Sequence, residues 1–140
     1  MASNTSATPF SLLIVEDDQA ASKVITRMVT MEFPECTIYC ADNGIAGIEI
    51  FRQFIPDIVL TDVNMPVMDG IELLRRIRSI RADAACIVLT AYSDKIAFQR
   101  CTDIGVSAYL LKPLDFTELF EAIEKCRAGF AKAGLSGAEN

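Results

Sequence analysis

The sequence predicts a doubly wound α/β fold, in which a five-stranded parallel sheet has helices on both faces. Five short apolar runs alternate with five longer amphipathic segments along the 140 residues, as a parallel sheet with crossover helices requires. Hydrophobic residues make up 51% of the chain, and its length suits one domain around a single core. Neither a repeat nor a low-complexity tract interrupts the pattern.

The predicted strands are the five apolar runs Leu12–Val15, Thr37–Ala41, Ile58–Thr61, Cys86–Thr90 and Ala108–Leu111. Because crossovers between parallel strands are right-handed, few windings are open to them. We expect the order 2-1-3-4-5 of a flavodoxin-like (βα)5 sheet. In such a sheet, ligands bind beyond the carboxyl ends of the strands, where the order switches between strands one and three.

Five helices are predicted: from about Gln19 to Phe33, Gly44–Phe54, from Gly70 to about Ile80, Lys95–Asp103, and from about Asp115 to Phe130. Pro34 and Pro56 follow the first two helices, where proline prevents continuation. Asp69 and Gly70 are expected to cap and turn into the third helix, and Gly105 to supply a positive-φ stop for the fourth. Residues 11–130 should therefore form the domain, with a flexible N-terminal segment at 1–10 and a frayed C-terminal tail at 131–140.

Composition narrows the classes of function. The formal net charge of -6 disfavours direct nucleic-acid binding, and the basic stretch Arg75–Arg78 is interpreted as the solvated face of a helix. No apolar run approaches the ~18 residues that span a bilayer, and Met1–Pro9 lacks the features of a signal peptide. We therefore expect a cytoplasmic protein without membrane contact, whose 5 cysteines are reduced.

The sequence contains no histidine, which excludes Ser-His and Cys-His catalysis and histidine metal ligands. Nor can the chain itself be the phosphohistidine donor of a phosphorelay. Any chemistry must use carboxylates, lysine, hydroxyl groups and the backbone.

Polar side chains follow four of the five predicted strands: Glu16, Asp17 and Asp18 after the first, Asp62 and Asn64 after the third, Thr90 at the end of the fourth, and Lys112 after the fifth. Each residue alone would more often be a helix cap or a solvated charge. Their convergence at the edge that the topology singles out predicts a functional site. Asp18 stands directly before the first helix, so we assign it the structural role of N-cap.

The charges at this edge favour a divalent cation. At ~4 Å and an effective dielectric near 20, each pair among Glu16, Asp17 and Asp62 repels by roughly 4 kcal/mol. Lys112 returns one positive charge, and hard carboxylate oxygens suit Mg²⁺. With both cations present, Asp62 could attack a phosphoryl group, since aspartyl phosphates are an established covalent class.

The chain resembles a response-regulator receiver domain of two-component signalling from about Ser11 to Phe130. The segments that carry the resemblance are Leu12–Asp17, Asp57–Gly70, Ile87–Ala91 and Gly105–Pro113. The second contains the specific string Asp-x-x-Met-Pro-x-Met-Asp-Gly, which begins at Asp62. Departures from the family pattern at Val106 and Leu114 concern packing.

The resemblance implies a role for each site residue: Asp62 as the phosphoacceptor, Glu16 and Asp17 as the acidic pair that holds Mg²⁺ with Asp62, Asn64 as a backbone carbonyl ligand, Thr90 as the conformational hydroxyl, Lys112 as the phosphate-binding lysine, and Tyr109 as the aromatic switch. It also implies a cis Lys112–Pro113 bond. The chain would not be an enzyme beyond magnesium-dependent self-phosphorylation and self-dephosphorylation at Asp62.

Partners also follow from the resemblance. A sensor histidine kinase or phosphotransfer protein would supply the phosphoryl group. A downstream protein or output domain would bind the surface made by the Lys95–Asp103 helix, strand five and the final helix, which could also mediate a phosphorylation-dependent homodimer. The chain could act alone, or it could be the receiver portion of a larger hybrid histidine kinase or multidomain regulator.

Two other classes fit the residues less well. A phosphatase with an aspartate nucleophile would need a second aspartate two residues after it, where Asn64 stands. An FMN carrier would need a Ser/Thr/Gly-rich phosphate loop after strand one. Glu16, Asp17 and Asp18 would instead repel the flavin phosphate.

Overall fold

A computed structural model describes residues 8–91 and 94–139, with side chains described as far as residue 130. It contains one five-stranded parallel sheet in the order β2-β1-β3-β4-β5, which confirms the predicted topology. The strands are β1 (Phe10–Val15), β2 (Cys36–Ala41), β3 (Ile58–Asp62), β4 (Ala85–Ala91) and β5 (Ala108–Lys112). The helices are α2 (Gln19–Glu32), α3 (Gly44–Phe54), α4 (Gly70–Ile80), α5 (Lys95–Ile104) and α6 (Phe116–Glu139).

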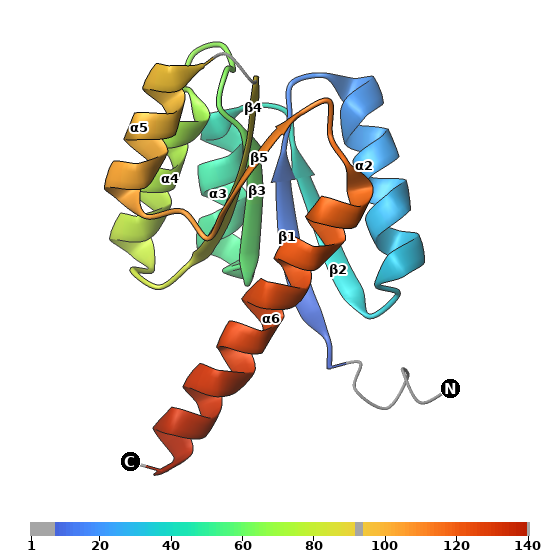
Figure 1. Ribbon diagram of the computed structural model, residues 1–140, viewed down its shortest axis with the longest axis vertical. Helices are drawn as coiled ribbons and strands as arrows, with labels where there is room; N and C mark the ends of the chain where they lie inside the picture. Colours follow the sequence, from blue (N-terminus) through green and yellow to red (C-terminus); the bar gives the residue numbers. More distant parts are fainter. Residues whose placement is uncertain (1–7, 92–93, 140) are drawn as a thin grey trace.

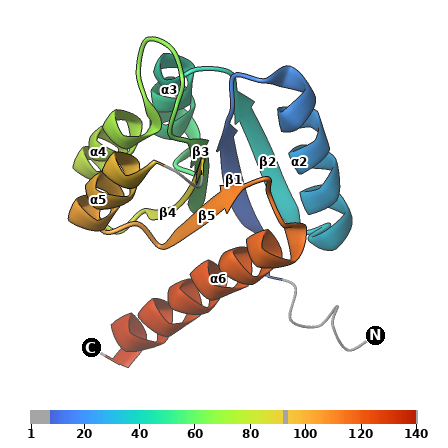
Figure 2. The same ribbon diagram turned by 45° about the horizontal axis from the view of Figure 1, so that its top comes forward.

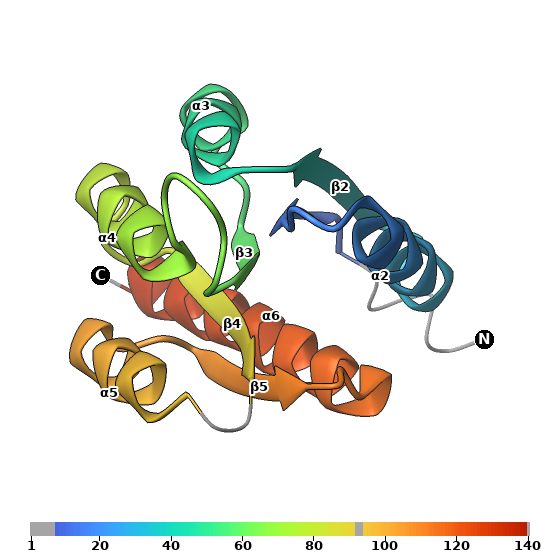
Figure 3. The same cartoon turned by 90° about the horizontal axis from the view of Figure 1, so that it is seen from above.

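The helices form two layers around the sheet (Figure 1). Seen from above, α3, α4 and α5 lie on one side, and α2 and α6 lie on the other (Figure 3). Each face of the sheet has its own apolar cluster because alternate strand residues point to opposite sides. Leu13 and Val59 belong to the first cluster, and Leu12 and Ile58 to the second. All four are fully buried, as expected for parallel strands covered on both faces.

Local signals place the helix ends. Asp18 accepts hydrogen bonds from the N–H groups of Ala20 and Ala21, so its predicted role as N-cap of α2 is confirmed. Asp69 accepts the Glu72 N–H and caps α4. Gly105 ends α5 with a φ of 81°, the left-handed conformation that glycine adopts without steric cost.

The last helix is longer than predicted. It continues through the segment expected to fray and ends at Glu139 rather than near Phe130 (Figure 2). Residues 131–139 contain no proline and consist mainly of good helix formers, with Gly134 and Gly137 as the only strong breakers. At the other end, β1 begins at Phe10, one residue before the predicted domain boundary, and residues 1–7 lie outside the described part.

Arg127 joins α6 to the amino-terminal end of the sheet. Its guanidinium lies 4.5 Å from the centre of the Phe10 ring, pairs with Glu35 at 2.8 Å and donates to the Thr8 carbonyl at 3.1 Å. The Arg127 and Glu35 side chains are only 15% and 14% exposed. This one residue therefore contacts the segment before β1, the β1 strand itself and the turn that precedes β2.

Arg127→Leu should lower the free energy of unfolding by about 2–4 kcal/mol, because it leaves the Glu35 carboxylate nearly buried without its partner. Chemical denaturation monitored by circular dichroism measures the change. Arg75→Leu is the control, since its pair with Glu72 is 57% and 38% exposed and should contribute about 1 kcal/mol at most. The Arg127→Leu/Glu35→Leu double variant should recover much of the loss, and failure to recover would show that Arg127 acts mainly through Phe10.

Candidate functional site

The strand register brings the predicted site residues to one edge of the sheet. Val15 lies opposite Thr61 and Asp62 lies opposite Leu89, so β1 and β3 end within one residue of each other and β4 ends two residues further along. Ala91 lies opposite Lys112, which adds the end of β5. Side chains that follow these strands therefore project into the same space, as the topology rule predicts.

Three carboxylates lie together at this edge. Glu16, Asp17 and Asp62 each offer an oxygen, and these atoms all lie within 4.8 Å of one another. Glu16 and Asp62 are each only 4% exposed, whereas Asp17 is exposed. A set of hard anionic oxygens at this spacing, with one member open to solvent, suits Mg²⁺ with some of its waters retained.

Lys112 provides the positive charge within this group. Its Nζ lies 2.6 Å from Asp62 Oδ2, and the Lys112–Pro113 peptide bond is cis, as predicted. Partial burial lowers the pKa of Lys112, but the bond to Asp62 and the charges of Asp62, Glu16 and Asp17 outweigh it. The pKa therefore lies above the ordinary value of 10.5, and Lys112 stays charged at neutral pH.

Glu16 shows the electrostatic cost of the arrangement. Burial raises its pKa above the ordinary 4.5, and the charge of Asp62 adds to the rise. A hydrogen bond from the Asp18 N–H, at 3.1 Å, and the charge of Lys112 oppose it without cancelling it. Ionisation of Glu16 is therefore harder in the folded protein than in water, and a bound cation would ease it.

Asn64 lies beside the phosphoacceptor candidate but is not brought into the carboxylate group by its side chain. It is exposed, and its backbone N–H donates to Asp62 Oδ1 at 3.4 Å. Its predicted role as a carbonyl ligand stays a prediction.

Thr90 and Tyr109 flank the site on the β4–β5 side. Thr90 is fully buried, and within residues 8–91 and 94–139 its hydroxyl makes no hydrogen bond of good geometry. It does lie close enough to the Tyr109 hydroxyl to oppose the rise in the Tyr109 pKa that burial causes. A buried polar atom without a partner is costly, which suggests that the Thr90 hydroxyl has another function. Tyr109 is half-buried, packs edge-on against Phe98 at 5.0 Å, and donates its hydroxyl to the Asp94 carbonyl at 3.4 Å.

Gly70 has a role that sequence reasoning missed. A Cβ at Gly70 would overlap the backbone carbonyl of Asp62, so this position requires glycine for close approach rather than for a turn. The Gly70 N–H also donates to the Val63 carbonyl at 2.8 Å. The two ends of the loop that follows Asp62 are therefore packed together as one unit.

Comparison with known proteins agrees with this geometry. The sequence profile described as response regulator receiver domain matches residues 12–124. Sporulation initiation phosphotransferase F of Bacillus subtilis is 31% identical over 113 residues, which cover 81% of this chain and 90% of that protein. Transcriptional regulatory protein PdtaR of Mycobacterium tuberculosis is 36% identical over 84% of this chain. The chain spans only 57% of PdtaR and 23% of the regulatory protein AtoC of Escherichia coli.

Solved structures give the same result. A response regulator receiver domain protein from Clostridium thermocellum is 26% identical with a TM-score of 0.79, and the match covers 84% of this chain and 93% of that one. CheY in the CheX-CheY-BeF3-Mg complex of Borrelia burgdorferi is 27% identical with a TM-score of 0.78, over 87% of this chain and 92% of the other. No helix in the described part is long and apolar enough to cross a membrane.

The crowding at Glu16 generates a prediction about stability. In EDTA at neutral pH, Glu16→Gln should raise the midpoint of thermal unfolding, because the amide keeps the bond from Asp18 and removes an unfavourable charge. A pKa raised by folding means that the glutamate contributes most below its ordinary value of 4.5 and loses that contribution as pH rises through the folded value. The advantage of the variant should therefore grow as pH increases and vanish in acid.

Differential scanning calorimetry from acidic to neutral pH measures this difference. Added Mg²⁺ should stabilise the wild type by mass action and Glu16→Gln much less. Glu49→Gln, at an exposed position on α3, should match the wild type throughout. An advantage of Glu16→Gln that is independent of pH would contradict the electrostatic interpretation.

Proposed function

The chain belongs to the response regulator receiver domain family, and we propose that it accepts a phosphoryl group on the Asp62 carboxylate from a phosphohistidine of a partner protein. The observation that carries the proposal is the environment of Asp62. This carboxylate is nearly buried, shares its site with Glu16 and Asp17, and accepts a bond from Lys112. The donor would be a sensor histidine kinase or a phosphotransfer protein.

In the transfer, an Asp62 carboxylate oxygen attacks the phosphorus atom and forms the acyl phosphate. The phosphorus–nitrogen bond of the phosphohistidine breaks, and its electron pair returns to the imidazole. Lys112 then donates to a phosphoryl oxygen and offsets its charge. Glu16, Asp17, Asp62 and the Asn64 carbonyl would hold Mg²⁺, which supplies charge stabilisation for the equatorial oxygens. Attack of water on the same phosphorus atom releases inorganic phosphate and restores Asp62.

The signal is proposed to pass through Thr90 and Tyr109. An acyl phosphate adds acceptor oxygens and about one negative charge. The Thr90 hydroxyl, which has no well-placed partner among the described residues, is a donor that can bind these oxygens. Movement of Thr90 toward Asp62 frees space for Tyr109, and the face made by α5, β5 and α6 changes shape. A downstream protein, an output domain or a second copy of the chain would bind that face. This is a population shift between two states.

We also propose two contexts for the domain: it acts alone, or it is part of a longer protein. The match to 90% of the Bacillus subtilis relative is compatible with a free-standing regulator, and the partial coverage of AtoC and PdtaR is compatible with a receiver within a longer protein. A hybrid histidine kinase is one longer protein that could contain such a receiver. The position of Asn64 disfavours an aspartate-nucleophile phosphatase, as the sequence indicated.

Incubation with acetyl phosphate and Mg²⁺ should add one phosphoryl group to the wild-type chain, as read by intact mass spectrometry. Asp62→Asn should abolish the mass gain, because an amide is a poor nucleophile. EDTA should abolish it as well. Asp57→Asn, at a hydrogen-bonded carboxylate beside Ser11 and away from the site, is the control. A mass gain that persists in Asp62→Asn would refute the assignment.

Thr90→Ala should accept the phosphoryl group but fail to transmit it, because the methyl group cannot donate a hydrogen bond. Amide chemical shifts with and without beryllofluoride, a stand-in for the phosphoryl group, measure the response. In the wild type and in Thr90→Ser, the resonances around Tyr109 should move, whereas in Thr90→Ala they should not. Equal movement in all three proteins would disprove the coupling and leave the role of Asp62 intact.

A further inference from the structure

The α5 helix is held by fewer apolar contacts than its neighbour. It buries only Ala97 and Cys101, whereas α4 buries five residues including four large aliphatic side chains. Ile96 and Phe98 on α5 are 75% and 54% exposed. Polar ties must therefore fix much of the position of α5.

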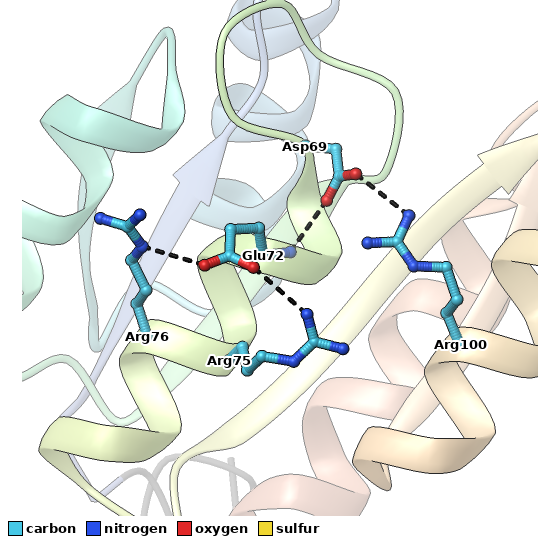
Figure 4. Close-up of polar contacts among 5 residues, drawn as sticks. All are labelled: Asp69, Glu72, Arg75, Arg76 and Arg100. Carbon is cyan, nitrogen blue, oxygen red and sulfur yellow. Dashed lines mark hydrogen bonds and ion pairs between the residues drawn. The ribbon is translucent and has the colours of Figure 1, made fainter.

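Two arginines supply ties in the second half of the helix, whereas the Tyr109 hydroxyl bonds the Asp94 carbonyl at its amino end. Arg78, in the last turn of α4, donates to the carbonyls of Ile104 at 3.3 Å and Gly105 at 3.1 Å, and so holds the carboxyl end of α5. Arg100, in the body of α5, pairs with Asp69 at 3.1 Å. Figure 4 shows Asp69 at the start of α4, with one oxygen directed to the Glu72 N–H and the other to Arg100.

Asp69 is firmly connected to the phosphoacceptor. It ends the loop that begins at Asp62, and the neighbouring Gly70 packs directly against the Asp62 carbonyl. Its cap bond to the Glu72 N–H, at 2.8 Å, fixes it to α4. Burial raises the pKa of Asp69, but the Glu72 N–H and Arg100 outweigh it and hold that pKa below 3.8, so the pair is charged at neutral pH.

We propose that the Asp69–Arg100 ion pair is a latch that holds α5 against the phosphoacceptor loop and opposes its movement on phosphorylation. This inference rests on the proposed role of Asp62. Asp94, the N-cap of α5, lies four residues after Thr90, so movement of Thr90 toward the phosphoryl group pulls the amino end of α5. Because Arg78 anchors the carboxyl end, the helix pivots and Arg100 moves away from Asp69. Both are positioning residues and neither contacts the phosphoryl group.

The strength of the pair fits this role. The Asp69 and Arg100 side chains are 34% and 37% exposed, and ion pairs of that exposure contribute modestly. Loss of the latch should shift a two-state equilibrium by about two- to five-fold. An ion pair of this strength shifts the equilibrium between the two states but does not prevent the transition.

Beryllofluoride affinity in the presence of Mg²⁺, from an NMR titration, tests the proposal. Arg100→Gln and Asp69→Asn should each tighten binding by about two- to five-fold, and asparagine keeps the helix cap. The double variant should bind no more tightly than either single one, because both remove the same interaction. Arg75→Gln is the matched control, since it breaks a pair within α4 that does not reach α5, and its affinity should equal that of the wild type.

Hydrogen exchange gives a second readout. Amides of α5 should exchange faster in Arg100→Gln and Asp69→Asn than in Arg75→Gln. Unchanged or weaker beryllofluoride binding in Arg100→Gln, or additive effects in the double variant, would overturn the latch. If the wild type shows no beryllofluoride binding that depends on Asp62, the proposed function fails instead, so the two failures are distinguishable.

Discussion

Charge crowding at the carboxyl edge of the sheet is the constraint to which the other features of this protein respond. Asp62 and Glu16 are nearly buried, and they lie together with Asp17 in a space that holds one lysine. Lys112 can reach Asp62 only because β4 lies between β3 and β5 and keeps them in register. The long-range order of the strands therefore determines whether the carboxylates can be gathered at all. Their mutual repulsion favours a bound cation.

The two sides of the site differ in how firmly they are built. The loop after Asp62 has little freedom, because Gly70 packs on the Asp62 carbonyl and Asp69 caps α4. The region of Thr90 and α5 has more freedom to move. The Thr90 hydroxyl lacks a well-placed partner in the described part, and the only buried side chains of α5 are the small ones of Ala97 and Cys101. Under the proposed function, the rigid half would position the reacting carboxylate while the looser half responds to it. Such a division would suit a population shift between two states.

Sequence predicted the features that local signals determine. The bounds of α3 and α4 are those expected, because Asn43 and Asp69 cap them and their apolar spacing is clear. The gathering of the carboxylates, Thr90 and Lys112 was predicted because the topology brings strand ends to one edge, whereas the role of Tyr109 was predicted from the family resemblance alone. The prediction that α6 ends near Phe130 was wrong, because no residue in the sequence marks its observed end at Glu139. The Arg100–Asp69 pair joins residues 31 positions apart, and it depends on the rotation of α5 about its axis. Periodicity does not define that rotation when most of a helix is exposed.

The length of α6 has a mechanical consequence. Leu119 is buried against the sheet near the start of α6. Arg127 connects the middle of α6 to Glu35, at the amino-terminal edge of the sheet. Beyond Arg127 the backbone continues as a helix to Glu139, well past the strands (Figure 1). At 1.5 Å per residue, Leu119 and Glu139 are about 30 Å apart, so a tilt of about 10° about Leu119 would displace the far end by about 5 Å. A small tilt of α6 would therefore be magnified at its carboxyl end, and the contacts of Arg127 restrain such a tilt.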